Sequence, residues 1–448
     1  MKDLNPEQRE AVRYIDGPLL VLAGAGSGKT RVITRKIAYL IEQCGIKASN
    51  IAAVTFTNKA AREMKERVAE LMSTRQASAR GLMVSTFHTL GLNILRRDGK
   101  SLGYRPGFSI FDAQDSLAVF RDLMGRDFAA DSDHAQEVQN LISNWKNQLI
   151  LPEQAAQIAD GAQEEFAARV YPRYVQALQA YNAVDFDDLI LKPVILFREH
   201  RDVLQKWQAK IHYLLVDEYQ DTNGCQYELV KQLVGIREKL TVVGDDDQSV
   251  YSWRGARPEN LVQLQTDFPR LNLIKLEQNY RSMGRILRVA NKLISHNPHV
   301  FEKRLWSAMG EGDAIRIIGC RDDEHESEKV ISELLYHKLK HQASFKDYAI
   351  LYRSNHQSRS LEKVLREHNV PYFLTGGTSF FSRVEVKDIM AYLRLLANQD
   401  DDNAFLRVIN TPRRGIGSST LQALGEYAAK RNTSMFGACF EMGLAESL

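Results

Sequence analysis

A glycine-rich segment, residues 23–30, reads Ala-Gly-Ala-Gly-Ser-Gly-Lys-Thr and lies between a strand-like run and a helical run. Its glycines allow backbone N–H groups to surround phosphate oxygens without Cβ clashes, and a helix N-terminus adds partial positive charge. We expect Lys29 to reach the β- and γ-phosphates of a nucleotide and the Thr30 hydroxyl to bind Mg²⁺. A chance glycine-rich turn is the alternative, and the complete Gly-Lys-Thr ending argues against it. The residues expected to hold the nucleotide are Ala23, Gly24, Ala25, Gly26, Ser27, Gly28, Lys29, Thr30 and Arg31.

Two adjacent carboxylates, Asp217 and Glu218, follow the apolar run Leu-Leu-Val at residues 214–216. Ligands of open α/β sheets bind at the carboxyl ends of strands, where this pair would lie. Asp217 is expected to hold Mg²⁺ through water, and Glu218 is expected to polarise the attacking water as a general base. Taken alone, such a pair is more often surface polarity. Together with the phosphate loop, it indicates hydrolysis of a nucleoside triphosphate.

Gln8 precedes the loop in the segment Leu-Asn-Pro-Glu-Gln, residues 4–8. A glutamine amide offers both a donor and an acceptor, which suits the hydrogen-bonding edge of adenine. The same segment is also an ordinary helix start, because Asn-Pro is typical of that position.

The elements that must position these residues alternate between short apolar runs and helical patterns, which predicts a parallel sheet with helices on both faces. The expected strands are 19–23, 51–56, 82–86, 213–217, 240–245 and 273–277, with helices at about 29–43 and 59–71. Residues 89–205 contain no strand-like run and are predicted to form a helical insertion. A second α/β domain is predicted from strands 314–320, 348–353 and 372–375 and helices 324–340 and 357–368, and the chain turns helical again after Gly377.

Composition excludes several classes of protein. The 448 residues carry 59 basic and 56 acidic side chains, a net charge of +3, so a nucleic-acid partner would need a local groove. The four cysteines are far apart and form no C-x-x-C pair, which argues against a zinc ribbon or an iron–sulfur site. No apolar run approaches the roughly 20 residues that cross a bilayer. We therefore expect a soluble, cytoplasmic protein with reduced thiols and no membrane partner.

Five further segments resemble, in order and spacing, motifs of the UvrD/Rep group of superfamily 1 DNA helicases, and of its Rep branch most closely. They are Thr-Phe-Thr-Asn-Lys-Ala-Ala at 55–61, Ser-Thr-Phe-His-Thr at 85–89, Asp-Phe-Asp-Asp-Leu at 185–189, the segment 244–256 around Asp-Asp-Asp-Gln-Ser, and Gln-Asn-Tyr-Arg-Ser at 278–282. Each alone could arise by chance, but the ordered set around a phosphate loop and an Asp-Glu pair is specific.

The resemblance implies roles for individual residues. Gln8 would read the adenine of ATP and Tyr280 would stack on it. Gln248 would sense the γ-phosphate and link it to DNA, and Arg281 would act as an arginine finger. Aromatic faces stack on bases of any sequence, at roughly 1–3 kcal/mol per base, although core packing is the usual role of a single aromatic residue. The residues expected to line the single-stranded DNA path are Phe56, Thr57, Thr86, His88, Phe186, Tyr251 and Trp253.

The resemblance also implies an architecture and an activity. A first RecA-like domain would comprise residues 1–88 and 206–276, with 89–205 inserted as a helical domain. Residues 277–373 would begin a second RecA-like domain, and 374–448 would begin the helical insertion within it. The implied activity is that of an ATP- and Mg²⁺-dependent 3′–5′ helicase or translocase. It would act on single-stranded DNA and duplex junctions in replication or repair, and it leaves open a homodimer or replication and repair partners.

Members of the family continue beyond Leu448, where this sequence ends, and their motifs V and VI, which come later, are not found here. We therefore expect a truncated chain with an incomplete second RecA-like domain, exposed apolar surface, weak binding of ATP and DNA, and poor unwinding. The alternatives are a non-motor fragment that binds ATP and DNA, or part of a helicase–nuclease. A P-loop kinase is disfavoured, because a kinase needs no aromatic DNA path.

Overall fold

The computed structural model describes residues 3–73, 79–124, 132–249, 255–297, 299, 301–375, 383–431, 433–441 and 443. The chain divides into two units, one of residues 1–312 and 391–448 and one of residues 313–390. Among the described residues, no helix has the length and apolar character that crossing a lipid bilayer requires.

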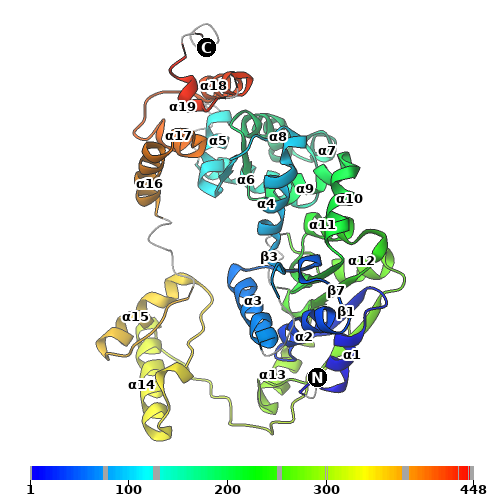
Figure 1. The fold of residues 1–448 in the computed structure, drawn as a ribbon. Helices are drawn as coiled ribbons and strands as arrows, with labels where there is room; N and C mark the ends of the chain where they lie inside the picture. Colours follow the sequence, from blue (N-terminus) through cyan, green and yellow to red (C-terminus); the bar gives the residue numbers. More distant parts are fainter. Residues whose placement is uncertain are drawn as a thin grey trace. The chain divides into compact units, whose positions relative to one another are not determined.

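The first unit contains a six-stranded parallel sheet in the order β3-β2-β6-β7-β1-β8. Three of these strands, β1, β3 and β7, are labelled in Figure 1. All six predicted strands are confirmed, as β1 (Leu19–Ala23), β2 (Ile51–Thr55), β3 (Met83–Thr86), β6 (Tyr213–Val216), β7 (Leu240–Gly244) and β8 (Asn272–Leu276). Strand β1 is an interior strand, since Leu20 pairs with Val242 of β7 on one side and with Leu273 of β8 on the other. A parallel sheet is buried on both faces, which is why its strands read as continuous apolar runs.

Helices cover both faces of this sheet. On one face Leu19, Val21 and their neighbours pack under α1 (Pro6–Arg13), α2 (Lys29–Glu42) and α3 (Asn58–Ser73). On the other face Leu20 and Leu22 pack under α4 (Phe87–Asp98), α9 (Asp188–Glu199), α10 (Arg201–Lys210), α11 (Gly224–Val234) and α12 (Asn260–Asp267). Helix α13 (Gly284–Ile294) follows β8. The fold is therefore the mixed α/β architecture predicted from the sequence.

A second core lies in the helical segment inserted after α4. It is built from α5 (Ala113–Met124), α6 (Ser132–Asn147), α7 (Pro152–Ile158) and α8 (Ala162–Ala180). The expectation of no strand in 89–205 was wrong, because β4 (Ser109–Phe111) and β5 (Ala183–Asp185) form a short parallel pair. Strands of three residues are too short to produce a recognisable alternation of apolar and polar residues.

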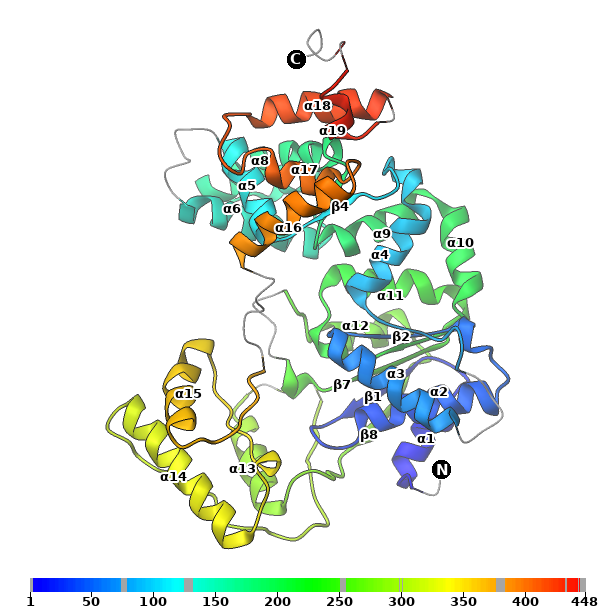
Figure 2. The ribbon, with the colours of Figure 1, turned by 60° about the vertical axis from the view of Figure 1, so that its left-hand side comes forward.

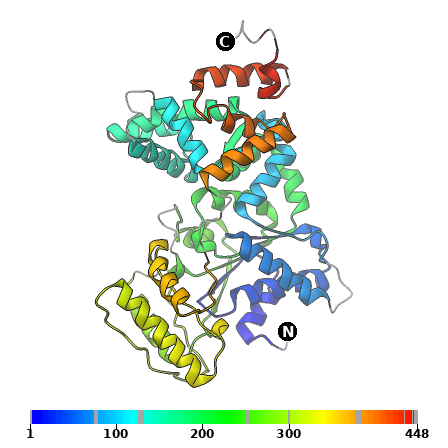
Figure 3. The same ribbon diagram turned by 90° about the vertical axis from the view of Figure 1, so that its left-hand side faces the viewer.

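The C-terminal helices share this second core. Figures 2 and 3 show α17 (Asp402–Val408), α18 (Ser418–Arg431) and α19 (Met435–Ala438) against α5 and α8. Their apolar residues, such as Phe405 and Leu424, join the same cluster as Phe120 and Tyr171. An ion pair of 2.9 Å between Arg407 and Asp115 adds a polar contact.

The second unit, residues 313–390, contains α14 (Asp323–His341) and α15 (Ser358–Glu367), which pack through a small core at Ile331 and Val364. Helix α16 (Val384–Ala397) begins here and continues into the first unit. The two helices were predicted correctly. The prediction of strands at 314–320, 348–353 and 372–375 was wrong, because the structure describes all of these residues and none of them is in a strand.

The reason lies in exposure. The side chains of Ile317, Leu351 and Phe373 are 96%, 92% and 90% exposed, and strand propensity expresses a fit to a half-buried surface that these residues do not have. The expectation of exposed apolar surface in this part of the chain is confirmed.

A buried ion cluster ties β5 to α6 and α9. Lys146 Nζ lies 2.7 Å from Asp185 Oδ2 and 2.9 Å from Asp188 Oδ1, and all three side chains are buried. Although burial alone lowers the pKa of Lys146, Asp185 and Asp188 raise it well above its usual value.

We expect Lys146→Met to lower the free energy of unfolding by about 3–5 kcal/mol, because it leaves buried carboxylates without a cation. Urea unfolding followed by circular dichroism measures this change. Lys100→Met, at an exposed lysine, is the matched control. A loss no larger than that of the control would mean that the cluster does not stabilise the fold.

Candidate nucleotide site and DNA path

The phosphate loop connects the end of β1 to the first residue of α2, as predicted. Gly26 and Gly28 have φ angles of 74° and 94°, in the left-handed region that favours glycine. The loop is also closely packed, because a Cβ on Gly26 would lie 2.6 Å from Asn279 Nδ2 and one on Gly28 would lie 2.8 Å from Gln8 Nε2. Both the backbone conformation and the available space therefore require glycine here.

Lys29 brings the ends of three neighbouring strands together. Its Nζ donates to Glu218 Oε2 at 2.7 Å and to Gln248 Oε1 at 3.2 Å. Glu218 follows β6, Gln248 follows β7, and Lys29 follows the loop after β1, which are adjacent strands of the sheet. Three residues that are far apart in the sequence thus meet at the carboxyl edge of the sheet, where ligands of such sheets bind.

Asp217 is buried at the end of β6 and its Oδ1 accepts the Glu218 backbone N–H at 3.0 Å. Burial raises the pKa of the Asp217 carboxyl to about 7, an effect that the charge of Glu218 increases and Lys29 opposes. A nearby cation would stabilise the ionised form of this buried carboxyl group. The Thr30 hydroxyl lies in the first turn of α2, and a hydroxyl and a carboxylate are both oxygen donors of the kind that Mg²⁺ prefers.

Glu218 adopts a φ of 50°, which is uncommon for a residue with a side chain. Gln220, which the sequence reasoning did not single out, is buried and donates to the same Glu218 oxygen as Lys29. Its Nε2 donates to Glu218 Oε2 at 3.0 Å, and its Oε1 accepts the Asp245 N–H at 2.9 Å. No sequence signal distinguishes Gln220, because its burial depends on the neighbouring strand.

Gln8 lies against the phosphate loop, and its amide already has partners at both ends. Its Nε2 donates to Ser27 O at 2.8 Å, and its Oε1 accepts the Asn5 N–H at 3.3 Å in the cap of α1. To read an adenine edge, the amide would have to exchange these partners for the base.

The segment 278–282 crosses the phosphate loop. The Tyr280 N–H donates to Gly26 O at 2.9 Å, and the Tyr280 ring and Arg281 are exposed. Asn279, which the sequence reasoning missed, donates from Nδ2 to Ala25 O and accepts the N–H groups of Arg281 and Ser282 at its Oδ1. An Asn that caps the two following residues is a recognised turn signal, and it could have indicated this role.

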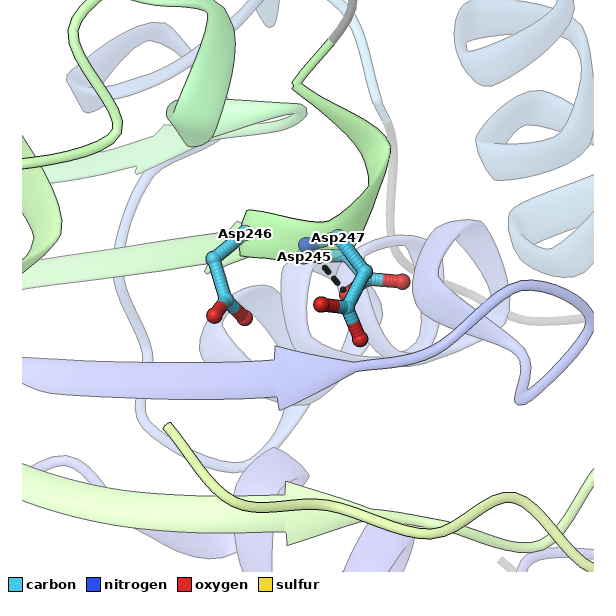
Figure 4. Close-up of side chains that lie close together, drawn as sticks. All are labelled: Asp245, Asp246 and Asp247. Carbon is cyan, nitrogen blue, oxygen red and sulfur yellow. Dashed lines mark hydrogen bonds between the residues drawn. The ribbon is translucent and has the colours of Figure 1, made fainter. Parts of the chain in front are cut away.

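The turn after β7 carries Gln248. Its Nε2 donates to Asp245 Oδ2, so one amide joins Asp245 to Lys29. Figure 4 shows Asp245, Asp246 and Asp247 side by side in this turn.

The DNA-path candidates differ in their surroundings. His88 and Phe186, from segments far apart in the sequence, form an edge-to-face pair with ring centroids 6.1 Å apart, and Phe186 is 51% exposed. Burial lowers the pKa of His88, which favours the neutral ring. This pair is an accessible aromatic surface of the kind on which bases stack.

Of the remaining candidates, three make packing or helix-capping contacts, and two lie outside the described residues. The Phe56 ring packs edge-to-face on the buried Phe87 at 5.5 Å. Thr86 is buried and accepts the Thr89 N–H to cap α4, whereas Thr57 is exposed and caps α3 through the Ala60 N–H. Tyr251 and Trp253 lie outside the described residues.

Comparisons with known proteins extend over nearly the whole chain. Residues 4–269 match the model of the UvrD/REP helicase N-terminal domain, and residues 274–436 match that of the UvrD-like helicase C-terminal domain. The chain is 58% identical over 445 residues to the ATP-dependent DNA helicase Rep of Escherichia coli, covering 99% of this chain and 66% of that protein.

Two further relatives are also named ATP-dependent DNA helicases. The chain is 46% identical over 433 residues to the Rep helicase of Buchnera aphidicola subsp. Schizaphis graminum, covering 97% of this chain and 66% of that protein. It is 44% identical over 446 residues to the ATP-dependent DNA helicase PcrA of Staphylococcus epidermidis, covering 99% of this chain and 60% of that protein. The chain thus spans no more than about two thirds of the length of these relatives.

Proposed function

We propose, because this chain belongs to the UvrD/Rep helicase family, that its nucleotide site drives movement along single-stranded DNA in the 3′ to 5′ direction. The observation that carries the proposal is the meeting of Lys29, Glu218 and Gln248 at the mouth of the phosphate loop. The substrates are ATP and single-stranded DNA or duplex junctions, in replication or repair. A homodimer or other replication and repair proteins are the partners of the working enzyme.

The contacts of Lys29 indicate how nucleotide binding starts the reaction. Its ammonium group pairs with Glu218 and Gln248. The β- and γ-phosphates of ATP would draw the ammonium toward them, which frees Glu218 to polarise water and the Gln248 amide to contact the γ-phosphate. Thr30 and Asp217 would hold Mg²⁺, which neutralises phosphate charge when bound. Arg281 and Tyr280 approach the same loop from the segment after β8.

Movement along DNA requires that the nucleotide state alters a DNA contact. Gln248 lies three residues before Tyr251 in the sequence, so a shift of its amide would pass to that segment over a short distance. The His88–Phe186 pair supplies a second stacking surface, which does not depend on base identity.

ATP hydrolysis by the 448-residue chain, with and without oligo(dT), tests the proposal. Weak binding of ATP and DNA is expected of this chain, so single-stranded DNA should increase the rate only modestly. Streptavidin should be displaced from a 5′-biotinylated oligonucleotide faster than from a 3′-biotinylated one. Detectable binding of ATP and DNA with no increase in hydrolysis would contradict the motor function. It would support a non-motor chain that binds ATP and DNA.

Phe186→Ala should weaken binding of oligo(dT) by roughly 5- to 150-fold, the loss of one base stack. Fluorescence anisotropy of a labelled oligonucleotide measures the dissociation constant. Phe440→Ala is the matched control, because Phe440 is also exposed and also forms an edge-to-face pair, with Phe436 at 5.2 Å. Equal affinities for the two variants would remove Phe186 from the DNA path.

A further inference from the structure

A lysine beyond α13 occupies the centre of the triple-aspartate turn, residues 245–247. The Lys303 side chain is only 5% exposed, and its Nζ lies 2.5 Å from Asp245 Oδ1 and 3.0 Å from Asp247 Oδ2, with a third contact to Asp246 Oδ1. The three carboxylates are close enough together to hold a cation (Figure 4). The ammonium group of Lys303 reaches all three, so it already supplies the positive charge that they require.

Backbone and ring contacts reinforce this attachment. The Phe301 N–H donates to Asp246 Oδ2 at 3.3 Å, and His299 Nδ1 lies 3.1 Å from Asp247 Oδ1. Although burial lowers the pKa of Lys303, Asp245 and Asp246 raise it above its usual value, so the group stays charged. His299, Phe301 and Lys303 are therefore held on the turn by charge as well as by hydrogen bonds.

The turn continues into the nucleotide site. Asp245 binds Lys303 through Oδ1 and accepts from Gln248 Nε2 through Oδ2. The other end of the Gln248 amide accepts from Lys29 at 3.2 Å. The orientation of this amide thus depends on a carboxylate whose own position depends on Lys303.

We propose that Lys303 is a positioning residue, which holds Asp245 so that the Gln248 amide is oriented toward the γ-phosphate of bound ATP. The proposal rests on the proposed function, in which Gln248 senses that phosphate. Without Lys303, Asp245 would be buried beside two like charges with no cation to hold it, and the Gln248 amide would lose its orienting partner.

Binding measurements that need no turnover test this role. ADP lacks the γ-phosphate, so we expect Lys303→Met to leave the ADP dissociation constant unchanged and to reduce the preference for ATP over ADP by about tenfold, as expected for one charge-assisted hydrogen bond. Displacement of a fluorescent ADP analogue by each nucleotide gives both constants. Lys303→Arg, which keeps the positive charge, should recover most of the preference. Lys292→Met, at an exposed lysine of α13, is the matched control.

A double-variant cycle shows whether Lys303 acts through Gln248. Gln248→Ala should reduce the ATP preference as Lys303→Met does, and combining the two changes should reduce it no further. If Lys303→Met fails to fold, Asp245→Ala breaks the same link while Asp246 and Asp247 remain to pair with Lys303, and it should give the same loss. An unchanged ATP preference in Lys303→Met or Asp245→Ala, or losses that add to that of Gln248→Ala, would overturn the proposal. Failure of the proposed function is a separate result, namely wild-type hydrolysis that single-stranded DNA does not increase.

Discussion

Replacing Lys29 with alanine should reduce the rate of ATP hydrolysis by roughly 10²- to 10³-fold, the usual effect of removing one charge-stabilising donor from a preorganised site. The Lys29 ammonium is the cation at the mouth of the phosphate loop, where it pairs with Glu218 and contacts Gln248. Without it, negative charge that builds on the β- and γ-phosphates in the transition state would not be neutralised. A coupled assay at saturating oligo(dT) measures the rate.

The fold should tolerate this change. The Glu218 side chain of the Lys29–Glu218 pair is 35% exposed, and partly exposed pairs stabilise a fold by less than about 1 kcal/mol. Thermal unfolding should therefore be nearly unchanged. Lys47→Ala, at an exposed lysine that follows α2, controls for loss of a lysine. Hydrolysis by Lys29→Ala at the rate of Lys47→Ala would mean that the ATPase site lies elsewhere.

Replacing Glu218 with glutamine should lower the turnover number by roughly 10²- to 10⁴-fold, the usual contribution of a general base. The change keeps the size of the side chain and its ability to accept hydrogen bonds from Lys29 and Gln220, but it removes the basic oxygen. ATP should still bind, because the phosphate loop and Lys29 are intact. Single-turnover hydrolysis, measured beside the ATP dissociation constant, separates the chemical step from binding.

The chain offers a close control for Glu218. Glu238 has a φ of 49°, nearly the same left-handed backbone conformation as Glu218, and pairs with Arg270 at 2.7 Å. Glu238→Gln therefore repeats the chemical change at a similar backbone angle without touching the nucleotide site, and it should hydrolyse ATP at the wild-type rate. If Glu218→Gln were as active as Glu238→Gln, Glu218 would not be the general base.

The parts of the molecule that were predicted correctly depend on short stretches of sequence. The strands of the six-stranded sheet are buried on both faces, so each is a continuous apolar run. Such a run can be recognised from its own residues, whichever strands lie beside it. The phosphate loop is equally local, since its left-handed glycines and the Lys29 that follows them lie within a few residues. The UvrD/Rep family was recognisable for the same reason, because its motifs are short and ordered.

Other features could not be predicted because they depend on contacts between distant residues. The apolar runs of the second unit resemble strands, yet their side chains remain exposed and no strand is found in its described residues. The C-terminal helices join the core of α5, α6 and α8, and neither segment alone shows which partner it will cover.

By itself, the sequence determined the sheet, the phosphate loop, the Asp217–Glu218 pair and the family, because each is written in residues that are neighbours along the chain. Only the tertiary structure decided that Lys29, Glu218 and Gln248 form one network, that Gln8 and Asn279 pack on the loop, and that Lys303 neutralises Asp245. The physical reason is that a buried charge or amide requires a partner within hydrogen-bonding distance, and the folding of the chain alone determines which distant residue supplies it.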